Sequence, residues 1–352
     1  MSAVIDKSVK IDFRKRRGRA RGHQTDPQAL QEVRELLGGT SRQRDMLIEA
    51  LHLIQDRYHH LSAKHLVALA DEFRLAPTEV FEVATFYHHF DVIRENESPP
   101  PALTVRVCDS MSCRMAGAED LIHDLDERFD ESVRVQRVPC VGRCQYAPVA
   151  VVGQNPIDSA DSLSVQQAAL NHETNPVLPD YVDFDAYCAL DGYKFYKSCV
   201  SGERQPEEVI EVLKNSNLRG LGGAGFPTGM KWSIVRNFSE PRLLAVNIDE
   251  GEPGTFKDRH FLESDPHRFL EGCLIASWAV GIDEIYLYLR DEYAACRSLL
   301  QKELESLQKN SPAKLPNIHL RRGAGAYVCG EESAMIESIE GKRGLPRLRP
   351  PY

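Results

Sequence analysis

Four of the nine cysteines stand in two close pairs whose spacing is suited to binding a metal. Cys108 and Cys113 form C-x4-C in "RVCDSMSCRM", and Cys140 and Cys144 form C-x3-C in "VPCVGRC". Four thiolates in two pairs can bind one zinc ion or one [2Fe–2S] cluster. Structural zinc sites usually present C-x2-C knuckles, so these wider spacings favour a cluster while zinc stays open.

Two other uses of the cysteines fit less well. The sequence has no apolar run of the roughly 20 residues that span a bilayer and no secretory signal, so we expect a cytoplasmic protein with reduced thiols. A thioredoxin-type redox pair needs C-x-x-C, which is absent. The other five cysteines have no ligand spacing and are expected to be buried or incidental thiols: Cys188, Cys199, Cys273, Cys296 and Cys329.

A glycine-rich stretch, "RGLGGAGFPTGMKW", is a candidate ligand loop. Gly222, Gly223 and Gly225 let the backbone approach a flat or phosphorylated ligand closely. Lys231 could offer a charge to a phosphate, and Phe226 an aromatic face to a ring. The stretch is neither a Walker loop nor a clean G-x-G-x-x-G motif, so a plain tight turn remains an equal alternative.

Two further loops combine glycines with acids. "NIDEGEPGTFKDR" and "GAGAYVCGEES" carry the candidate residues Asn247, Asp249, Glu250, Glu252, Tyr327, Gly330, Glu331 and Glu332. On composition alone a solvated acidic turn is the favoured interpretation of the first loop, and the second loop repeats its pattern. We expect all three loops at strand ends of one domain, and together they favour a nucleotide site.

The elements around these residues indicate an α/β multidomain protein. Residues 27–98 are predicted to form a helical bundle, and three prolines then mark a boundary. Residues 99–170 have the β-α-β-β order of a thioredoxin-like domain, with each cysteine pair after a strand. Residues 171–204 are less regular and are predicted to be a linker. Strands and helices alternate over 205–352, as in an α/β sheet.

Finer expectations concern the helical region. Ser62 is placed to cap the second of its main helices. Adjacent residues point to different sides of a helix, so the paired histidines are expected at the surface: His59, His60, His88 and His89. One stripe of the first amphipathic helix is predicted to be buried: Leu47, Leu51, Ile54 and Tyr58.

Charge excludes some functions. The 352 residues carry a net charge of −9, which argues against generic nucleic-acid binding. The exception is "RKRRGRARGH" at 14–23. We interpret residues 1–26 as a basic flexible tail rather than an arm that docks on an acidic partner.

Together these motifs resemble a known family. Residues 27–170, with "EVFEVATFY" and the two cysteine pairs, resemble the thioredoxin-like [2Fe–2S] subunit of respiratory NADH dehydrogenase. Residues 205–352 resemble the amino-terminal part of its flavoprotein subunit, which binds FMN and NADH. Fusion of both is typical of the β (diaphorase) subunit of molybdenum- or tungsten-dependent, NAD-linked formate dehydrogenases. The diaphorase of NAD-reducing hydrogenase is fused similarly, but its small domain has generally lost the cysteine ligands.

The resemblance implies roles for the candidate residues. The four paired cysteines would bind one [2Fe–2S] cluster. Phe226, Glu252 and Glu332 would face NAD(H). FMN would be surrounded by Gly222, Gly223, Gly225, Lys231, Asn247, Asp249, Glu250, Tyr327, Gly330 and Glu331. Leu221 and Ile234 depart from the family pattern, so the nucleotide contacts of these two positions stay open.

The implied activity is electron transfer from formate, oxidised by a molybdenum- or tungsten-containing α subunit, through clusters and FMN to NAD⁺. Family members continue past "PPY" with a segment that completes the flavin site and with four cysteines for a [4Fe–4S] cluster. If this chain ends at Tyr352, FMN binding is expected to be weaker. The alternatives are the diaphorase of a hydrogenase or of a respiratory dehydrogenase, and a non-catalytic scaffold that carries only the [2Fe–2S] cluster.

Overall fold

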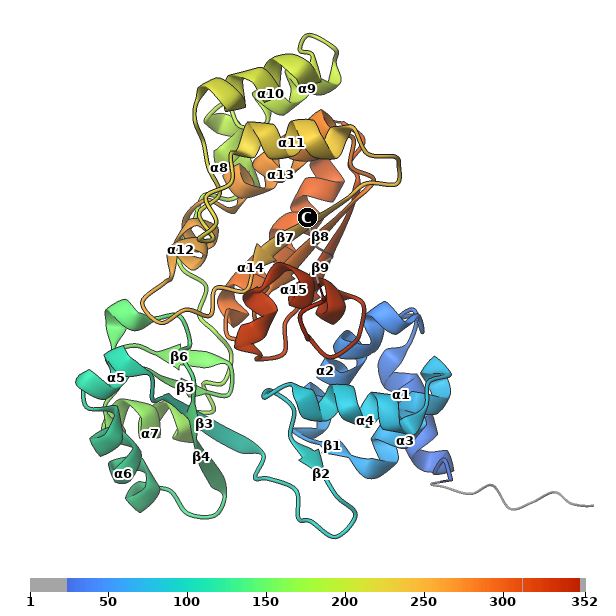
Figure 1. Cartoon of the computed structure of the whole chain (residues 1–352). Coiled ribbons are helices and arrows are strands. Elements are labelled where there is room, and N and C mark those ends of the chain that lie inside the picture. The colour runs from blue at the N-terminus through green and yellow to red at the C-terminus, as the bar shows by residue number, and fades with distance from the viewer. Residues whose placement is uncertain (1–23, 312, 349–352) are drawn as a thin grey trace, which may run out of the picture.

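The computed structural model describes residues 24–311 and 313–348. Most of the tail predicted at 1–26 and the last four residues lie outside this range. Figure 1 shows three parts: a helical part in blue, a small α/β part in green, and a larger α/β part in yellow to red that contacts both. No helix of the described residues is long and apolar enough to cross a membrane.

The helical part has most of the predicted core, although Tyr58, which was predicted to be buried, is only partly buried. Ser62 caps α3 as predicted, since its hydroxyl accepts a hydrogen bond from His65 N at 3.2 Å. Leu47, Leu51 and Ile54 are fully buried. The elements are α1 (Pro27–Leu37), η2 (Arg44–Met46), α2 (Leu47–Tyr58), β1 (Leu61–Ser62), α3 (Ala63–Phe73), α4 (Pro77–Phe86) and β2 (Val92–Ile93).

The second part has the predicted thioredoxin-like order plus one extra strand. Its sheet runs β4-β3-β5-β6, with β3 and β4 parallel and the other pairs antiparallel. Helix α6 contacts β3 and β4, and α7 contacts β5. The elements are β3 (Leu103–Cys108), α5 (Met111–Met115), α6 (Ala118–Arg128), β4 (Val133–Val138), η3 (Cys144–Tyr146), β5 (Ala150–Val152), β6 (Asn155–Ile157) and α7 (Ser162–Leu170).

The segment predicted as a linker, 171–204, differs from that expectation. It contains α8 (Phe184–Ala189) and α9 (Lys194–Val200), and Tyr187, Tyr193 and Tyr196 lie in the core of the third part. The buried Glu271 accepts hydrogen bonds from Tyr187 Oη at 2.5 Å and from Tyr193 N at 2.9 Å. Two short helices leave no long periodic pattern, which explains why the sequence indicated irregular structure.

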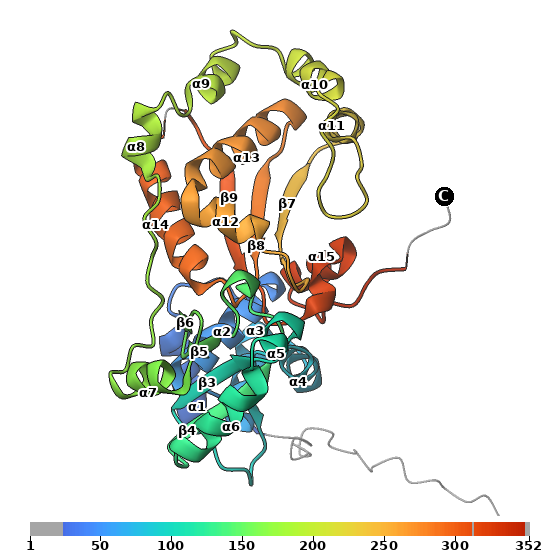
Figure 2. The ribbon, with the colours of Figure 1, turned by 90° about the vertical axis from the view of Figure 1, so that its left-hand side faces the viewer.

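The third part is the predicted α/β sheet. Strands β7, β8 and β9 are parallel neighbours, so their carboxyl ends share one edge. Figure 2 shows α12, α13 and α14 on one side of the sheet and α15 at its lower end. The elements are α10 (Pro206–Asn215), α11 (Thr228–Arg236), β7 (Leu243–Ile248), α12 (Lys257–Ser264), α13 (Pro266–Val280), β8 (Glu284–Leu289), α14 (Ala294–Asn310), β9 (Asn317–Arg322), η4 (Tyr327–Gly330) and α15 (Glu332–Ile339).

The helical part joins the sheet through a shared core. Tyr288, Cys329 and Met335 of the third part pack in the same buried cluster as α2, α3 and α4. Arg321 at the end of β9 pairs with Asp45 at 2.6 Å. The loops at the carboxyl edge of the sheet are therefore held between the two smaller parts.

Candidate functional site

The four paired cysteines meet at one end of the thioredoxin-like sheet. Cys108 is the last residue of β3 and Cys113 lies in α5, while Cys140 follows β4 and Cys144 begins η3. Because β3 and β4 are parallel neighbours, the loops after them lie side by side. The two pairs, distant in sequence, are thus brought together as predicted from their positions after strands.

The sulfur atoms lie close enough to share one metal centre. Cys140 Sγ is 3.3 Å from Cys144 Sγ, and the Cys108 thiol contacts both Cys113 and Cys140. Three of the four are almost fully buried, and all are free thiols rather than disulfides. The hydrogen bond with Cys113 raises the pKa of Cys108 to about 11, and a bound cation would stabilise the thiolate of this residue.

The loops after β7 and β9 also lie together, as predicted. Asn247 Nδ2 donates to Gly330 O at 2.9 Å, which ties the end of β7 to η4. The Tyr327 hydroxyl donates to Glu252, and a Cβ on Gly251 would lie 3.0 Å from Tyr327 Cδ2. Tyr327 is 68% exposed, so most of its ring is free to contact a ligand.

Asp249 carries an unused acceptor in this pair of loops. Its Oδ2 is buried and has no hydrogen-bond partner among the described residues. Burial, with a smaller effect of Glu292, raises the pKa of Asp249 to about 7. Buried polar atoms normally have partners, so an orphaned oxygen here fits a site that a polar ligand completes.

Glu250 and Glu331 hold their own loops in place. Glu250 is 6% exposed, and its carboxylate accepts from Asp258 N at 3.1 Å and from Tyr293 Oη at 3.0 Å. Glu331 caps α15 by accepting from Ser333 N at 2.9 Å. Their place around FMN stays a prediction; in the structure Glu250 fixes the start of α12 and Glu331 the start of α15. Glu332 is exposed in the first turn of α15.

The glycine-rich loop is not at a strand end, which corrects that expectation. It joins α10 to α11, and Figure 2 shows it beside the β7 edge, on the same side as α15. Gly223 and Gly225 have φ of 104° and 62°, which favour glycine, and a Cβ on either would meet nothing within 4 Å. Phe226 is 46% exposed and Lys231 is also exposed. The loop therefore offers open space and free side chains to a ligand.

A cavity of about 130 Å³ lies where the three parts meet. Its lining includes Arg106, Cys140, Asp249, Arg290 and Tyr327, so it connects the cysteine loops with the β7 and β9 loops. It can hold several waters but is smaller than the roughly 300 Å³ that small-molecule sites start from.

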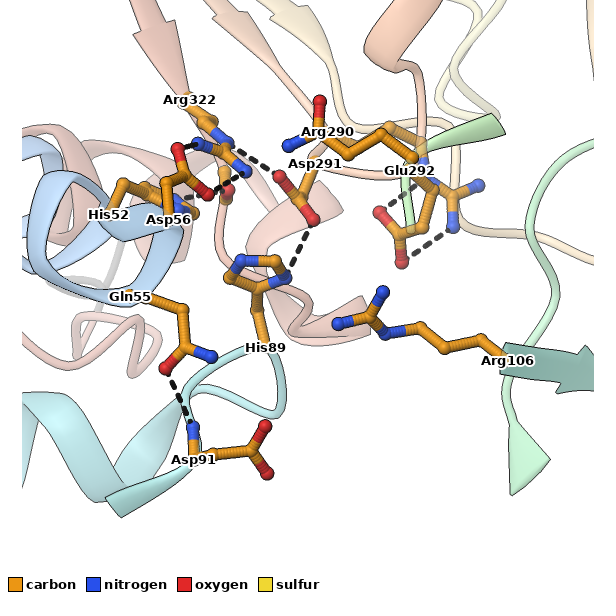
Figure 3. Close-up of polar contacts among 12 residues, drawn as sticks. His52, Gln55, Asp56, His89, Asp91, Arg106, Arg290, Asp291, Glu292 and Arg322 are labelled. Carbon is orange, nitrogen blue, oxygen red and sulfur yellow. Dashed lines mark hydrogen bonds and ion pairs between the residues drawn. The ribbon is translucent and has the colours of Figure 1, made fainter. Parts of the chain in front are cut away.

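Beside this cavity, buried charges join the helical part to the third part. His89 Nδ1 lies 2.7 Å from Asp291 Oδ2, and Arg322 Nε lies 2.5 Å from Asp291 Oδ1 (Figure 3). Arg322 also pairs with Asp56 of α2 at 2.5 Å. His89 has only 11% of its side chain exposed, so the expectation of a surface histidine is wrong for this residue.

His52, His89 and Asp291 offer ligand atoms within 4.8 Å of one another, as some metal sites do. Arg322 and Arg297, at 2.5 Å and 3.3 Å from Asp291, already supply positive charge there. A divalent cation would be repelled by both guanidinium groups, so we interpret this cluster as an interdomain charge network.

The third part also holds the second cysteine loop directly, which the sequence did not indicate. Gly254 N donates to Cys144 Sγ at 3.2 Å. Arg290 donates to Cys140 O at 2.6 Å, and Arg259 donates to Gly142 O at 3.0 Å. A charged residue at the end of a buried strand, as in "YLRDEY", was the available signal for Arg290.

Two family models match the chain. Residues 33–171 match the thioredoxin-like [2Fe–2S] ferredoxin, and residues 213–352 match the Nuo51 FMN-binding domain. Among curated proteins, a subunit of the NADH-quinone oxidoreductase of Rhizobium meliloti is 44% identical over 51% of this chain and 44% of its own length. The α subunit of the NAD-reducing hydrogenase HoxS of Cupriavidus necator is 32% identical over 88% of this chain and 58% of its own.

Solved structures are similar to this chain over the same two domains. An NAD⁺-reducing [NiFe]-hydrogenase in its air-oxidised state aligns with a TM-score of 0.73 and 32% identity, over 89% of this chain and 57% of that one. The chain thus spans about half the length of the curated relatives it matches.

The domain matches decide between zinc and a cluster for the buried cysteines. They also agree with two features of the third part. The open glycine loop fits the phosphate of a flavin nucleotide, and the unpaired Asp249 oxygen fits a polar group of the flavin. The chain therefore combines a thioredoxin-like [2Fe–2S] domain with an FMN-binding domain.

Proposed function

We propose that this chain is the diaphorase part of an NAD-linked oxidoreductase, which passes electrons between a partner subunit and NAD(H). The observation that carries the proposal is the hydrogen bond from Gly254 N to Cys144 Sγ at 3.2 Å. It brings Cys144, a proposed cluster ligand, into contact with the β7 loop, which carries candidate nucleotide residues. Relatives named as NADH-quinone oxidoreductase and NAD-reducing hydrogenase subunits support NAD(H) as the substrate.

FMN, when bound, exchanges a hydride with nicotinamide and single electrons with iron–sulfur clusters. The protein residues bind and orient the groups around it. The exposed rings of Phe226 and Tyr327 offer stacking faces, and the glycine loop offers backbone amides. Asp249, with its raised pKa and unpaired oxygen, can hold or release a proton near neutral pH. Gly222, Lys231 and Gly330 stay proposed FMN contacts, and Glu252 and Glu332 proposed NAD(H) contacts.

Activity can be tested on the isolated chain. We expect flavin release on denaturation, a reduced [2Fe–2S] signal by electron paramagnetic resonance, and NADH-dependent reduction of ferricyanide. A cluster signal with neither flavin nor activity would instead support the scaffold alternative. A matched variant, Phe226→Ala, should weaken NADH turnover while the cluster signal stays unchanged, since Phe226 lies outside the cysteine loops.

For the partner, we propose the α subunit of a molybdenum- or tungsten-dependent formate dehydrogenase. The four intact cysteines and the quoted loop motifs support it. The diaphorase of an NAD-reducing hydrogenase is the second candidate, because the HoxS α subunit aligns over 88% of this chain. Formate-dependent NAD⁺ reduction by the native complex, with the large subunit identified by mass, favours the first. Hydrogen-dependent reduction with no response to formate would exclude it.

A further inference from the structure

The second cysteine loop, 139–144, is held by the FMN-binding domain at three alternate positions, 140, 142 and 144. Arg290 Nη2 donates to Cys140 O at 2.6 Å, Arg259 Nε to Gly142 O at 3.0 Å, and Gly254 N to Cys144 Sγ at 3.2 Å. These bonds reach both cysteines of the pair, one through its carbonyl and one through its sulfur. The environment of the cluster is therefore set from outside its own domain.

Both arginines are buried at this contact. Arg290 and Arg259 are each 4% exposed. Arg290 pairs with Glu292 at 3.0 Å and Arg259 with Glu263 at 2.6 Å. Arg259 Nη2 has no hydrogen-bond partner among the described residues although it is buried. Buried guanidinium groups fixed beside a redox centre act through a low local dielectric, so their effect is larger than at a surface.

The fit at this contact is close. A Cβ on Gly142 would lie 2.4 Å from a ring carbon of Tyr293, and Gly142 has a φ of 72°, which favours glycine. Tyr293 donates to Glu250 Oε2 at 3.0 Å, and Arg290 also donates to Glu250 O. One guanidinium thus connects the backbone of a cluster ligand with the backbone of the β7 loop.

Hydrogen bonds to cluster sulfurs and nearby positive charge favour the reduced, more negative form of an iron–sulfur cluster. We propose that Arg290 is a positioning residue that raises the reduction potential of the [2Fe–2S] cluster, by holding the 139–144 loop so that Gly254 bonds Cys144. Arg259 assists by fixing Gly142. The inference rests on the proposed function, because it concerns the cluster that this function uses.

The test is a potentiometric titration of the full chain, followed through the paramagnetic signal of the reduced cluster. Arg290→Gln removes both carbonyl contacts and leaves Glu292 without its partner. At the wild-type midpoint potential, the ratio of oxidised to reduced cluster should rise at least tenfold, a fall of about 59 mV for a one-electron couple.

Two milder variants separate charge from positioning. Arg290→Lys keeps the charge, but one ammonium cannot reach Cys140 O and Glu250 O with a fork, so the potential should still fall, though less than in Arg290→Gln. In Arg259→Lys the reduction potential should fall by a still smaller amount. These variants also carry the test if Arg290→Gln does not retain iron.

The matched control is Arg297→Gln. Arg297 is a largely buried arginine that also bridges domains, since it donates to Gln154 Oε1 at 2.7 Å and lies 3.3 Å from Asp291. Arg297 bonds neither Cys140 nor Gly142, so the cluster in Arg297→Gln should keep the wild-type reduction potential. An equal fall in Arg297→Gln, or unchanged potentials in both Arg290 variants, would overturn the inference. A wild-type chain that binds no [2Fe–2S] cluster would overturn the cluster assignment itself.

Discussion

The cysteine loops and the flavin loops are built in opposite ways. Three of the four paired cysteines are at most 3% exposed, and the Cys108 thiol contacts those of Cys113 and Cys140. Tyr327 and Phe226 are 68% and 46% exposed, and Asp249 has an oxygen without a partner. The first site comes from two adjacent loops of one small sheet. The second draws on three segments, of which only two follow strands, and it is shaped to be completed by a ligand.

The largest effect is expected at the closed site. Cys140→Ala removes one of four sulfurs from a buried cluster site, so the [2Fe–2S] cluster should be lost. Iron and sulfide analysis with the paramagnetic signal measures this. The control is Cys188→Ala, because Cys188 is exposed in α8 and has no ligand spacing. Full iron content in Cys140→Ala would show that the four cysteines are not the ligand set.

At the open site we expect a large effect on ligand binding. Gly223→Val adds a side chain that meets no protein atom but enters the space that we propose for FMN. The FMN dissociation constant should rise tenfold or more, while the free energy of unfolding falls only by the cost of a positive φ, about 1–2 kcal/mol. Fluorescence titration of FMN gives the affinity. Gly38→Val is the matched control, since Gly38 also has a positive φ and open surroundings.

Asp249 tests whether the open site is incomplete without its ligand. Its folded pKa of about 7 exceeds the ordinary unfolded value of about 3.9, so the unfolded state releases its proton first. The flavin-free protein should therefore lose stability as pH rises from about 4 to 7, by at most about 1.4 kcal/mol per pH unit, and then level off.

Asp249→Asn removes this pH dependence, so the unfolding free energy of the variant should rise relative to that of the wild type between about pH 4 and 7. Denaturant unfolding at several pH values measures the difference. A constant difference between the two proteins from about pH 4 to 8 would mean that Asp249 does not titrate near neutrality.

The smallest effect is expected where the two sites join. Glu250→Gln keeps the size of a side chain that accepts from Asp258 N, Lys257 and Tyr293 but removes its charge. The unfolding free energy should fall by about 1–3 kcal/mol. Because this carboxylate is turned into the domain, the flavin potential should change little. A large shift of the flavin potential would show instead that the Glu250 charge acts on the cofactor, as the sequence suggested.

Sequence patterns captured the helices, strands and cysteine loops because these depend on local periodicity and on loops after neighbouring strands. The stripe of Leu47, Leu51 and Ile54 and the Ser62 cap are such local features. Residues 184–200 were missed because their burial depends on Glu271, more than 70 positions away. Arg290 and Arg259 were missed for the same reason, since only the docked domains bring them to Cys140 and Gly142.

The buried position of the cysteines also bears on how the protein matures. Cys108, Cys113 and Cys140 are at most 3% exposed, and the loop of Cys140 is covered by Arg290, Arg259 and Tyr293 of another domain. Docking of the domains therefore restricts the access of a scaffold protein that delivers iron and sulfide to the Cys140 loop. We expect cluster insertion to precede domain docking during biogenesis.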